Sequence, residues 1–271
     1  MSHITQDEWI DTIRGEYLQS FIKRGGAAVK FAVPMDDINH DQLLNLLRKT
    51  AEEEDYLFTS VDAISTKIHM IDKLFHEVAR QIDWDELSLT FVKKIFTKND
   101  YQLPIHREDF DFQNIAAINK REEKFLRKEV RSWFEAEIFR DFEMSQEFRI
   151  AMMRLCLEQL NLAGPPFLSN AVKEWLRGEL RLISTLKEAL IFQKIARHNA
   201  RHMLFSLTHW LRVNGKSGLV LVLDITRYLI STRSKNPDDG FFYSLPALLD
   251  IYEVLRQFID GTDELEGCLV V

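Results

Sequence analysis

Glycine, proline and cysteine are all scarce in this sequence. Its 271 residues include 10 glycines, 6 prolines and 2 cysteines. Few glycines and prolines, beside many leucines, isoleucines, arginines and glutamates, favour long helices and few loops. The cysteines, Cys156 and Cys268, lie far apart and lack the CxxC or Cys/His spacing of a zinc site. We therefore expect two buried free thiols and no metal site.

Long apolar runs are absent as well. No run approaches the ~18 residues that cross a bilayer. The N-terminus does not place an apolar segment behind a basic start, as a signal peptide would. With 46% hydrophobic and 28% charged residues, the composition is typical of a globular protein. We expect a cytoplasmic protein that does not contact membranes.

Charge is unevenly spread along the chain. The net charge is −7, but residues 173–235 carry net +8 and the remainder net −15. A basic segment of this kind favours the phosphates of a nucleic acid or an acidic surface, including this chain's own acidic remainder. Its basic residues are Lys173, Arg177, Arg181, Lys187, Lys194, Arg197, Arg201, Arg212, Lys216, Arg227, Arg233 and Lys235.

The N-terminal third predicts the beginning of an α/β fold. Residues 5–26 repeat apolar side chains at helical spacing and end in a glycine pair, which is typical of an amphipathic helix. Two β-prone runs, 27–33 and 55–63, flank a leucine-rich helical segment, and this order indicates a βαβ unit with a parallel sheet. The pattern over 67–98 predicts more helix, with a break near Asp83.

The rest of the chain divides into a helical part and a second α/β part. Residues 100–190 contain no convincing strand. A long helix over 186–215, the strand "GLVLVLD" at 218–224, a helix over 245–264 and the strand "GCLVV" follow. We expect an α/β fold with a helix-rich parallel-sheet core, formed by 1–98 and 191–271 around an all-α insertion at 99–190. Because a buried terminal strand usually has a continuation, we also expect the native chain to extend beyond Val271.

The letters Gly215, Lys216 and Ser217 look like part of a phosphate-binding loop. Such a loop requires GxxxxGK[ST] between a strand and the helix that follows it. Here Trp210 stands where the first glycine belongs, and the three residues precede the strand. The sequence therefore predicts an ordinary turn with a solvated lysine.

A phosphate loop would have to follow the first strand, where residues 34–40 read PMDDINH. This segment lacks glycine, lysine and any hydroxyl for magnesium, and Asp36 and Asp37 would repel a triphosphate. Strand 218–224 ends in Asp224, like a magnesium-binding Walker B strand, but Ile225 replaces the glutamate that polarises water. We predict no catalytic residue; Asp36, Asp37 and Asp224 are the candidate remnants of a site for ATP and Mg²⁺.

Several segments resemble one known family, in chain order. They are residues 175–225, from "WLRGEL" to the strand, the opening "YLQSFIKRGGAAVKFAV", and "HMIDKLFHEVARQI" after "VDA". These segments resemble the ATP-binding P-loop proteins of the BREX phage-defence systems (BrxC/BrxD-like), with degenerate Walker motifs as the departure. The resemblance implies an AAA+- or STAND-like P-loop NTPase core, in which "GCLVV" is the sensor-1 strand and a further strand and lid follow. It also implies a cytoplasmic defence assembly that acts on invading DNA.

Two polar clusters allow more than one interpretation. On a continuous helix, His198 and His202 would share a face at a metal-binding spacing, but Arg197 and Arg201 would repel a cation. We favour a basic face that contacts phosphate groups or an acidic surface. Asp83, with Asp85 and Glu86 behind it, is interpreted as the N-cap of a helix with an acidic first turn.

The leading functional hypothesis is a catalytically degenerate P-loop NTPase-like subunit. It would serve as a structural or regulatory part of an antiphage complex, as a homo- or hetero-oligomer beside an intact ATPase paralogue. The alternatives are an ATP-binding or weakly active ATPase of a BREX-like system, and a DNA-binding module that uses the basic segment 173–235.

Overall fold

The computed structural model describes residues 4–33, 40–160, 167–230 and 240–271 and consists of two compact units. Unit 1 combines Met1–Val78 with Leu207–Val271, and unit 2 is Ala79–Ser206. Unit 2 thus begins earlier and ends later than the insertion expected at 99–190. The reason lies in packing, because α4 (Trp84–Lys98) lies against α7 (Gln146–Glu158) inside unit 2.

Unit 1 is built on a four-stranded sheet in which all pairs are parallel. The strand order is β1-β4-β3-β2. The strands are β1 (Ala27–Val29), β2 (Tyr56–Asp62), β3 (Gly218–Asp224) and β4 (Cys268–Val270). The predicted helix-rich α/β fold with a parallel sheet is confirmed. However, β1 and β2 of the expected βαβ unit lie at opposite edges, with β4 and β3 between them.

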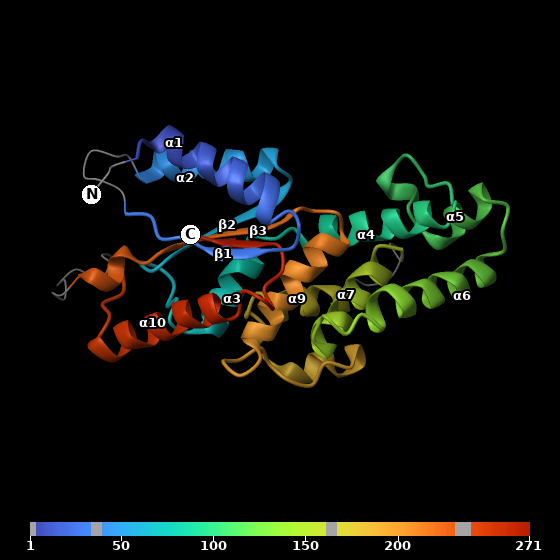
Figure 1. Ribbon diagram of the computed structural model, residues 1–271. Helices are drawn as coiled ribbons and strands as arrows, with labels where there is room; N and C mark the ends of the chain where they lie inside the picture. The colour runs from blue at the N-terminus through green and yellow to red at the C-terminus, as the bar shows by residue number, and fades with distance from the viewer. Residues whose placement is uncertain (1–3, 34–39, 161–166, 231–239) are drawn as a thin grey trace. The chain divides into compact units, whose positions relative to one another are not determined.

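Helices cover both faces of this sheet (Figure 1). On one face lie α1 (Gln6–Thr12), its π-helical continuation η1 (Ile13–Phe21) and α2 (His40–Glu53); on the other lie α3 (Ile71–Arg80) and α10 (Leu245–Asp260). A sheet buried on both faces needs nearly continuous apolar strands, and five of the seven β3 residues are buried. Apolar side chains of α1, η1 and α2 pack on Tyr56, Val220 and Leu269 of the sheet.

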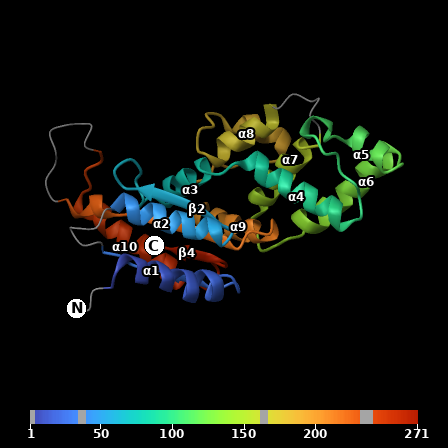
Figure 2. The ribbon, with the colours of Figure 1, turned by 90° about the horizontal axis from the view of Figure 1, so that it is seen from above.

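Unit 2 contains helices and no strand among its described residues, as expected for the insertion (Figure 2). Its core is aromatic, with Trp84 edge-on to Phe148 and Phe91 tilted against Phe134. Besides α4 and α7 it contains α5 (Phe112–Ile118), α6 (Glu123–Phe134), α8 (Phe167–Leu176) and the short helices η2 (Arg107–Asp109), η3 (Glu135–Phe139) and η4 (Ile183–Ala189). In the part of the chain that is described, no helix is long and apolar enough to cross a membrane.

The long helix expected over 186–215 is wrong. The 3₁₀ helix η4 ends at Ala189, Leu190 adopts a left-handed conformation with φ 64°, and α9 spans only Ala200–Val213. Asn199 stabilises the break, because its Oδ1 accepts the Ala196 N–H at 2.8 Å and its Nδ2 donates to the Lys194 carbonyl at 3.2 Å. Asparagine commonly competes with helical hydrogen bonding in this way.

Both cysteines are buried free thiols, as predicted. Cys268 lies in β4 between β1 and β3, and Cys156 lies in α7 with its Sγ 3.9 Å from the Ser88 carbonyl. Burial raises the pKa of each thiol well above its ordinary value. Neither cysteine therefore has the thiolate character of a reactive site.

Gly218 begins β3 where no larger residue fits. Its φ is 149°, and a Cβ atom would lie 1.9 Å from the Gly267 carbonyl oxygen. Gly218→Ala should therefore lower the free energy of unfolding by about 1–3 kcal/mol, as overpacked substitutions do. Gly15→Ala is the matched control, because no atom lies within 4 Å of the Cβ that alanine would add there. Alanine at this helical position should raise the free energy of unfolding by about 0.5–1 kcal/mol. Chemical denaturation followed by circular dichroism compares the two, and equal effects would contradict the assignment.

Candidate functional site

A pocket lies at the carboxyl edge of the sheet in unit 1. Ligands of open parallel sheets bind at this edge, because the strand ends and the loops that follow them converge there. The pocket is small, with a cavity volume of about 120 Å³, and it is open to solvent. Its walls come from the residues after β1, the ends of β3 and β4, and the first turns of α2, together with Trp9 and Leu255.

Asp224 is the one carboxylate among the described residues that line this pocket. Its Oδ1 accepts hydrogen bonds from the Thr226 backbone N–H at 2.9 Å and the Thr226 hydroxyl at 2.6 Å. Its Oδ2 lies 3.6 Å from Nε2 of His40, at the start of α2. Thr226 therefore fixes the orientation of the carboxylate and leaves its second oxygen directed at His40.

Lys30 brings a positive charge to the same pocket. It directly follows β1, and its backbone N–H donates to the Val270 carbonyl at 2.8 Å, which extends the pairing with β4. Its ammonium lies 4.1 Å from the centre of the Tyr17 ring, a cation–π contact that holds the side chain. Lys30, His40 and Thr226 were not among the sequence-predicted site residues. The available signals were that Lys30 lies in the β-prone run 27–33, that His40 ends the segment 34–40 where a phosphate loop would stand, and that Thr226 closely follows the strand 218–224.

The rest of the pocket wall is apolar. Ile225 lines it next to Asp224. Leu43, Leu44 and Leu47 of α2 form much of the opposite wall. Of the other predicted remnants, Asp36 and Asp37 lie outside the described residues. His40 is the one imidazole among the described residues that line the pocket.

Asp62 ends β2 in register with Asp224, so two adjacent strands end in aspartate. Its Oδ1 accepts the Ile64 backbone N–H at 2.6 Å, which closes a turn after the strand. Asp62 is not among the residues that line the pocket. No group of three or more His, Cys, Asp or Glu side chains able to hold a metal occurs within the described ranges.

The Gly215–Ser217 stretch is a turn, as predicted. Gly215 follows α9 with φ 92°, and the Lys216 N–H donates to the Leu211 carbonyl at 3.0 Å, which caps the helix end. The lysine is not simply solvated, because Lys216 Nζ lies 2.6 Å from Asp55 Oδ1. Asp55 precedes β2 as Lys216 precedes β3, so the ion pair lies at the amino edge of the sheet, opposite the pocket.

The break before α9 separates the predicted basic cluster. Arg197 and His198 lie in a turn ahead of the helix, while Arg201 and His202 lie in its first turn. His198 and His202 therefore do not share a helix face, and the i and i+4 arrangement expected from the sequence is wrong. The side chains of Arg197, His198 and His202 are exposed, and the Arg201 guanidinium stacks over Phe205 at 5.0 Å.

Part of the basic segment is neutralised within its own unit. Lys173 Nζ lies 2.7 Å from Asp85 Oδ2 in unit 2, and Lys216 pairs with Asp55 in unit 1. Arg227 donates from Nε to the Phe241 carbonyl at 2.7 Å. Arg233 and Lys235 lie outside the described residues. Asp85 and Asp55 lie outside the basic segment, in the acidic remainder of the chain. The charge distribution indicated this remainder as one partner of the basic segment.

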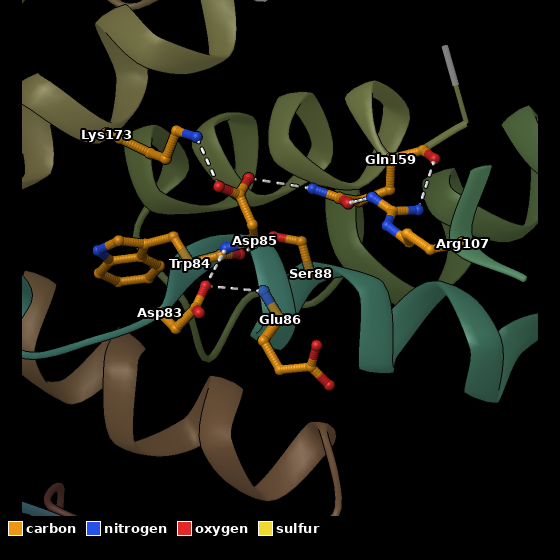
Figure 3. Close-up of polar contacts among 8 residues, drawn as sticks. All are labelled: Asp83, Trp84, Asp85, Glu86, Ser88, Arg107, Gln159 and Lys173. Atoms are coloured by element: carbon orange, nitrogen blue, oxygen red, sulfur yellow. Dashed lines mark hydrogen bonds and ion pairs between the residues drawn. The ribbon is translucent and has the colours of Figure 1, made fainter. Parts of the chain in front are cut away.

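The acidic cluster at 83–86 is a helix start, as interpreted from the sequence (Figure 3). Asp83 Oδ1 accepts the backbone N–H groups of Asp85 at 3.1 Å and Glu86 at 3.0 Å, so Asp83 is the N-cap of α4. Asp85 instead joins α4 to its neighbours, because it also accepts a hydrogen bond from Gln159 Nε2 at 3.2 Å. Gln159 in turn accepts from the Arg107 guanidinium. These contacts serve the packing of unit 2.

Comparisons with protein-family models, with curated proteins and with solved structures find no match to this chain. The geometry of the carboxyl-edge pocket and the resemblance noted in the sequence therefore carry the functional argument.

The N-cap assignment of Asp83 makes a testable claim about stability. Asp83→Ala should lower the free energy of unfolding by about 1 kcal/mol, because two backbone N–H groups of α4 lose their acceptor. Asp83→Ser should retain most of the stability, since serine caps helices about as well as aspartate. Glu86→Gln is the control in the same turn. Urea denaturation measures all three, and an unchanged Asp83→Ala variant would refute the cap.

Proposed function

We propose that this chain is a catalytically degenerate P-loop NTPase-like subunit with a structural or regulatory role. The observation that carries the proposal is the carboxyl-edge pocket, where β3 ends in Asp224 and Ile225 follows it. The carboxylate that would hold magnesium is present and oriented by Thr226. The group that would polarise an attacking water is replaced by the apolar side chain of isoleucine.

The order of the strands supports a P-loop type of core. The resemblance assigns β1 to the P-loop strand, β3 to the Walker B strand and β4 to the sensor-1 strand. In an AAA+ core the sensor-1 strand lies between the other two, and β4 lies between β1 and β3 here. This placement brings the end of β1, with Lys30, and the end of β3, with Asp224, to one pocket.

Besides Asp224, the described residues that line the pocket include no carboxylate to polarise an attacking water, although Asp224 could still bind a cation. Mg²⁺ is usually bound by one or two carboxylates together with phosphate oxygens, so Asp224 would suffice only if a nucleotide supplied the phosphates. His40 is the group nearest to Asp224 that could accept a proton, but its ring contacts the carboxylate itself. We propose that the subunit works in the cytoplasm in an antiphage assembly, beside an intact ATPase paralogue that performs the hydrolysis.

Nucleotide binding tests the proposal directly. We expect a fluorescent ATP analogue with Mg²⁺ to bind no more tightly than about 1 mM, an affinity that corresponds to few productive contacts. Asp224→Ala should leave this weak binding unchanged, and so should Asp62→Ala, the matched control at the end of the neighbouring strand. Micromolar binding that Asp224→Ala abolishes and Asp62→Ala preserves would overturn the degenerate assignment. ATP turnover that His40→Ala abolishes would favour the weakly active ATPase instead.

The N-terminus of α9 favours a second function, contact with the phosphates of DNA. Arg197, His198 and His202 are exposed within two turns of this helix start, where the helix dipole also attracts anions. A phosphate at this position would meet several cationic groups and the first N–H groups of a helix of 14 residues. This role is compatible with a subunit that does not hydrolyse ATP.

Salt dependence distinguishes this mode of binding from others. Duplex DNA should bind more weakly as salt rises, and Arg197→Ala/Arg201→Ala should reduce the slope of log K against log salt by about 1 for each phosphate that is no longer neutralised. Lys98→Ala/Arg140→Ala is the control, because both residues lie in the same unit and are already paired with Glu137 and Glu135. Absent or salt-independent binding would remove this second function.

A further inference from the structure

An apolar stripe runs along the outer face of α10. The side chains of Leu245, Leu249, Tyr252 and Ile259 are 69%, 60%, 56% and 48% exposed. Together with Arg256 they follow an alternating spacing of four and three residues, which at 3.6 residues per turn places them within an arc of about 80°. The opposite face of the helix, with Ile251, Val254 and Phe258, is buried in unit 1. The exposed stripe is therefore a second apolar face of α10. Contact of such a contiguous apolar surface with water is unfavourable, and such surfaces commonly mark sites of interaction.

Acidic side chains flank the stripe. Residues 245–267 contain six carboxylates and one arginine. Arg256 pairs with Glu253 at 2.9 Å and Asp260 at 3.1 Å, which leaves the surroundings of the stripe negative. Two α10 stripes packed on each other would bring these carboxylates together, and like charges across an interface are unfavourable. The stripe is suited to an apolar partner with positive charge at its rim.

A groove with an apolar floor and basic residues along its side lies in unit 2, among α6, α7 and the residues after η4. Its cavity volume is about 1260 Å³, above the ~300–1,000 Å³ of sites for small molecules. Ile150, Met153 and Leu157 of α7 line it at helical spacing. At the rim, Leu190 and Phe192 are 56% and 66% exposed. Leu190 keeps a left-handed backbone, which is unfavourable for a residue with a side chain.

The groove carries cations along one wall. Arg127, Lys128 and Arg131 of α6 line it, and Arg154 joins them from α7. Neither Lys128 nor Arg131 has a carboxylate within 4.0 Å among the described residues, and both are exposed. The lining contains three carboxylates: Glu135 is paired with Arg140, Glu147 accepts a hydrogen bond from Gln193, and burial raises the pKa of Glu158. The groove therefore offers an apolar floor beside a positive wall.

We propose that α10 of one copy of this chain docks into the unit 2 groove of another copy. The stripe from Leu245 to Ile259 is about 21 Å long at 1.5 Å per residue, and amphipathic helices commonly bind apolar grooves through such spaced anchors. The carboxylates beside the stripe then face Lys128 and Arg131. Because the two surfaces differ, the contact is head-to-tail, and it builds rings or open chains. It is independent of nucleotide and of DNA.

Sedimentation velocity of the full chain at about 1–100 μM, without nucleotide or DNA, tests this assembly, since that range covers micromolar interfaces. We expect species heavier than the 31.9 kDa single chain, increasing with concentration. Leu249→Glu/Tyr252→Glu, which disrupts the stripe, and Arg131→Glu/Phe192→Glu, which disrupts the groove, should each sediment as single chains. All four positions are exposed, so both variants should fold, and circular dichroism checks this.

Mixing the two variants distinguishes a head-to-tail contact from any other. The stripe variant keeps an intact groove and the groove variant keeps an intact stripe, so a 1:1 mixture should form a complex of two chains that cannot grow further. Ile105→Glu is the control, because Ile105 is 95% exposed outside both surfaces and its variant should assemble like the parent. A parent chain that stays single throughout the range, a groove variant that still associates, or a mixture without a complex would each overturn the proposal.

Discussion

The pairing of β3 with its two neighbours is the interaction on which the rest of unit 1 depends. Seven residues of β3 pair with β2, and three of them, Leu219–Leu221, also pair with β4, which in turn pairs with β1. Residues 1–78 and 207–271 are separated in the chain by the whole of unit 2. These parallel ladders and the helices that cover them combine the two segments into one core, together with side-chain contacts such as the Lys216–Asp55 ion pair and the hydrogen bond from the Tyr243 hydroxyl to the Ala63 carbonyl. The glycine at 218 permits the ladder to begin beside the Gly267 carbonyl.

This arrangement also determines where chemistry can occur. In a parallel sheet all strand ends share one edge, so Lys30, Asp224 and the end of β4 meet there although they are far apart in sequence. The resulting pocket has an oriented carboxylate, a histidine and an amine on mainly apolar walls. Such a set can hold a cation or anchor a polar group. It does not supply the water-polarising carboxylate that phosphoryl transfer requires next to Asp224.

The helical unit has a different physical character. Its aromatic core and the network of Asp85, Gln159 and Arg107 stabilise its helices, while α6, α7 and the left-handed Leu190 leave a large groove open on its surface. Unit 2 has this groove, and unit 1 has the exposed apolar stripe of α10. Both surfaces are suited to association with another protein surface. That property agrees with a subunit whose role is structural.

The sequence by itself determined the elements with strong local signals. The apolar run at 218–224, the N-cap Asp83 and the Gly215 turn depend on residues close in the chain, and each is found where it was predicted. The resemblance to phage-defence NTPases stays a prediction. Only the tertiary structure decided that Lys30 lines one pocket with Asp224, that His40 lies 3.6 Å from this carboxylate and that β4 separates β1 from β3, because these arrangements join distant residues. The break in the helix expected over 186–215 has a local cause instead, because the Asn199 side chain hydrogen bonds to the backbone of Ala196 and Lys194, which the spacing of the apolar residues does not reveal.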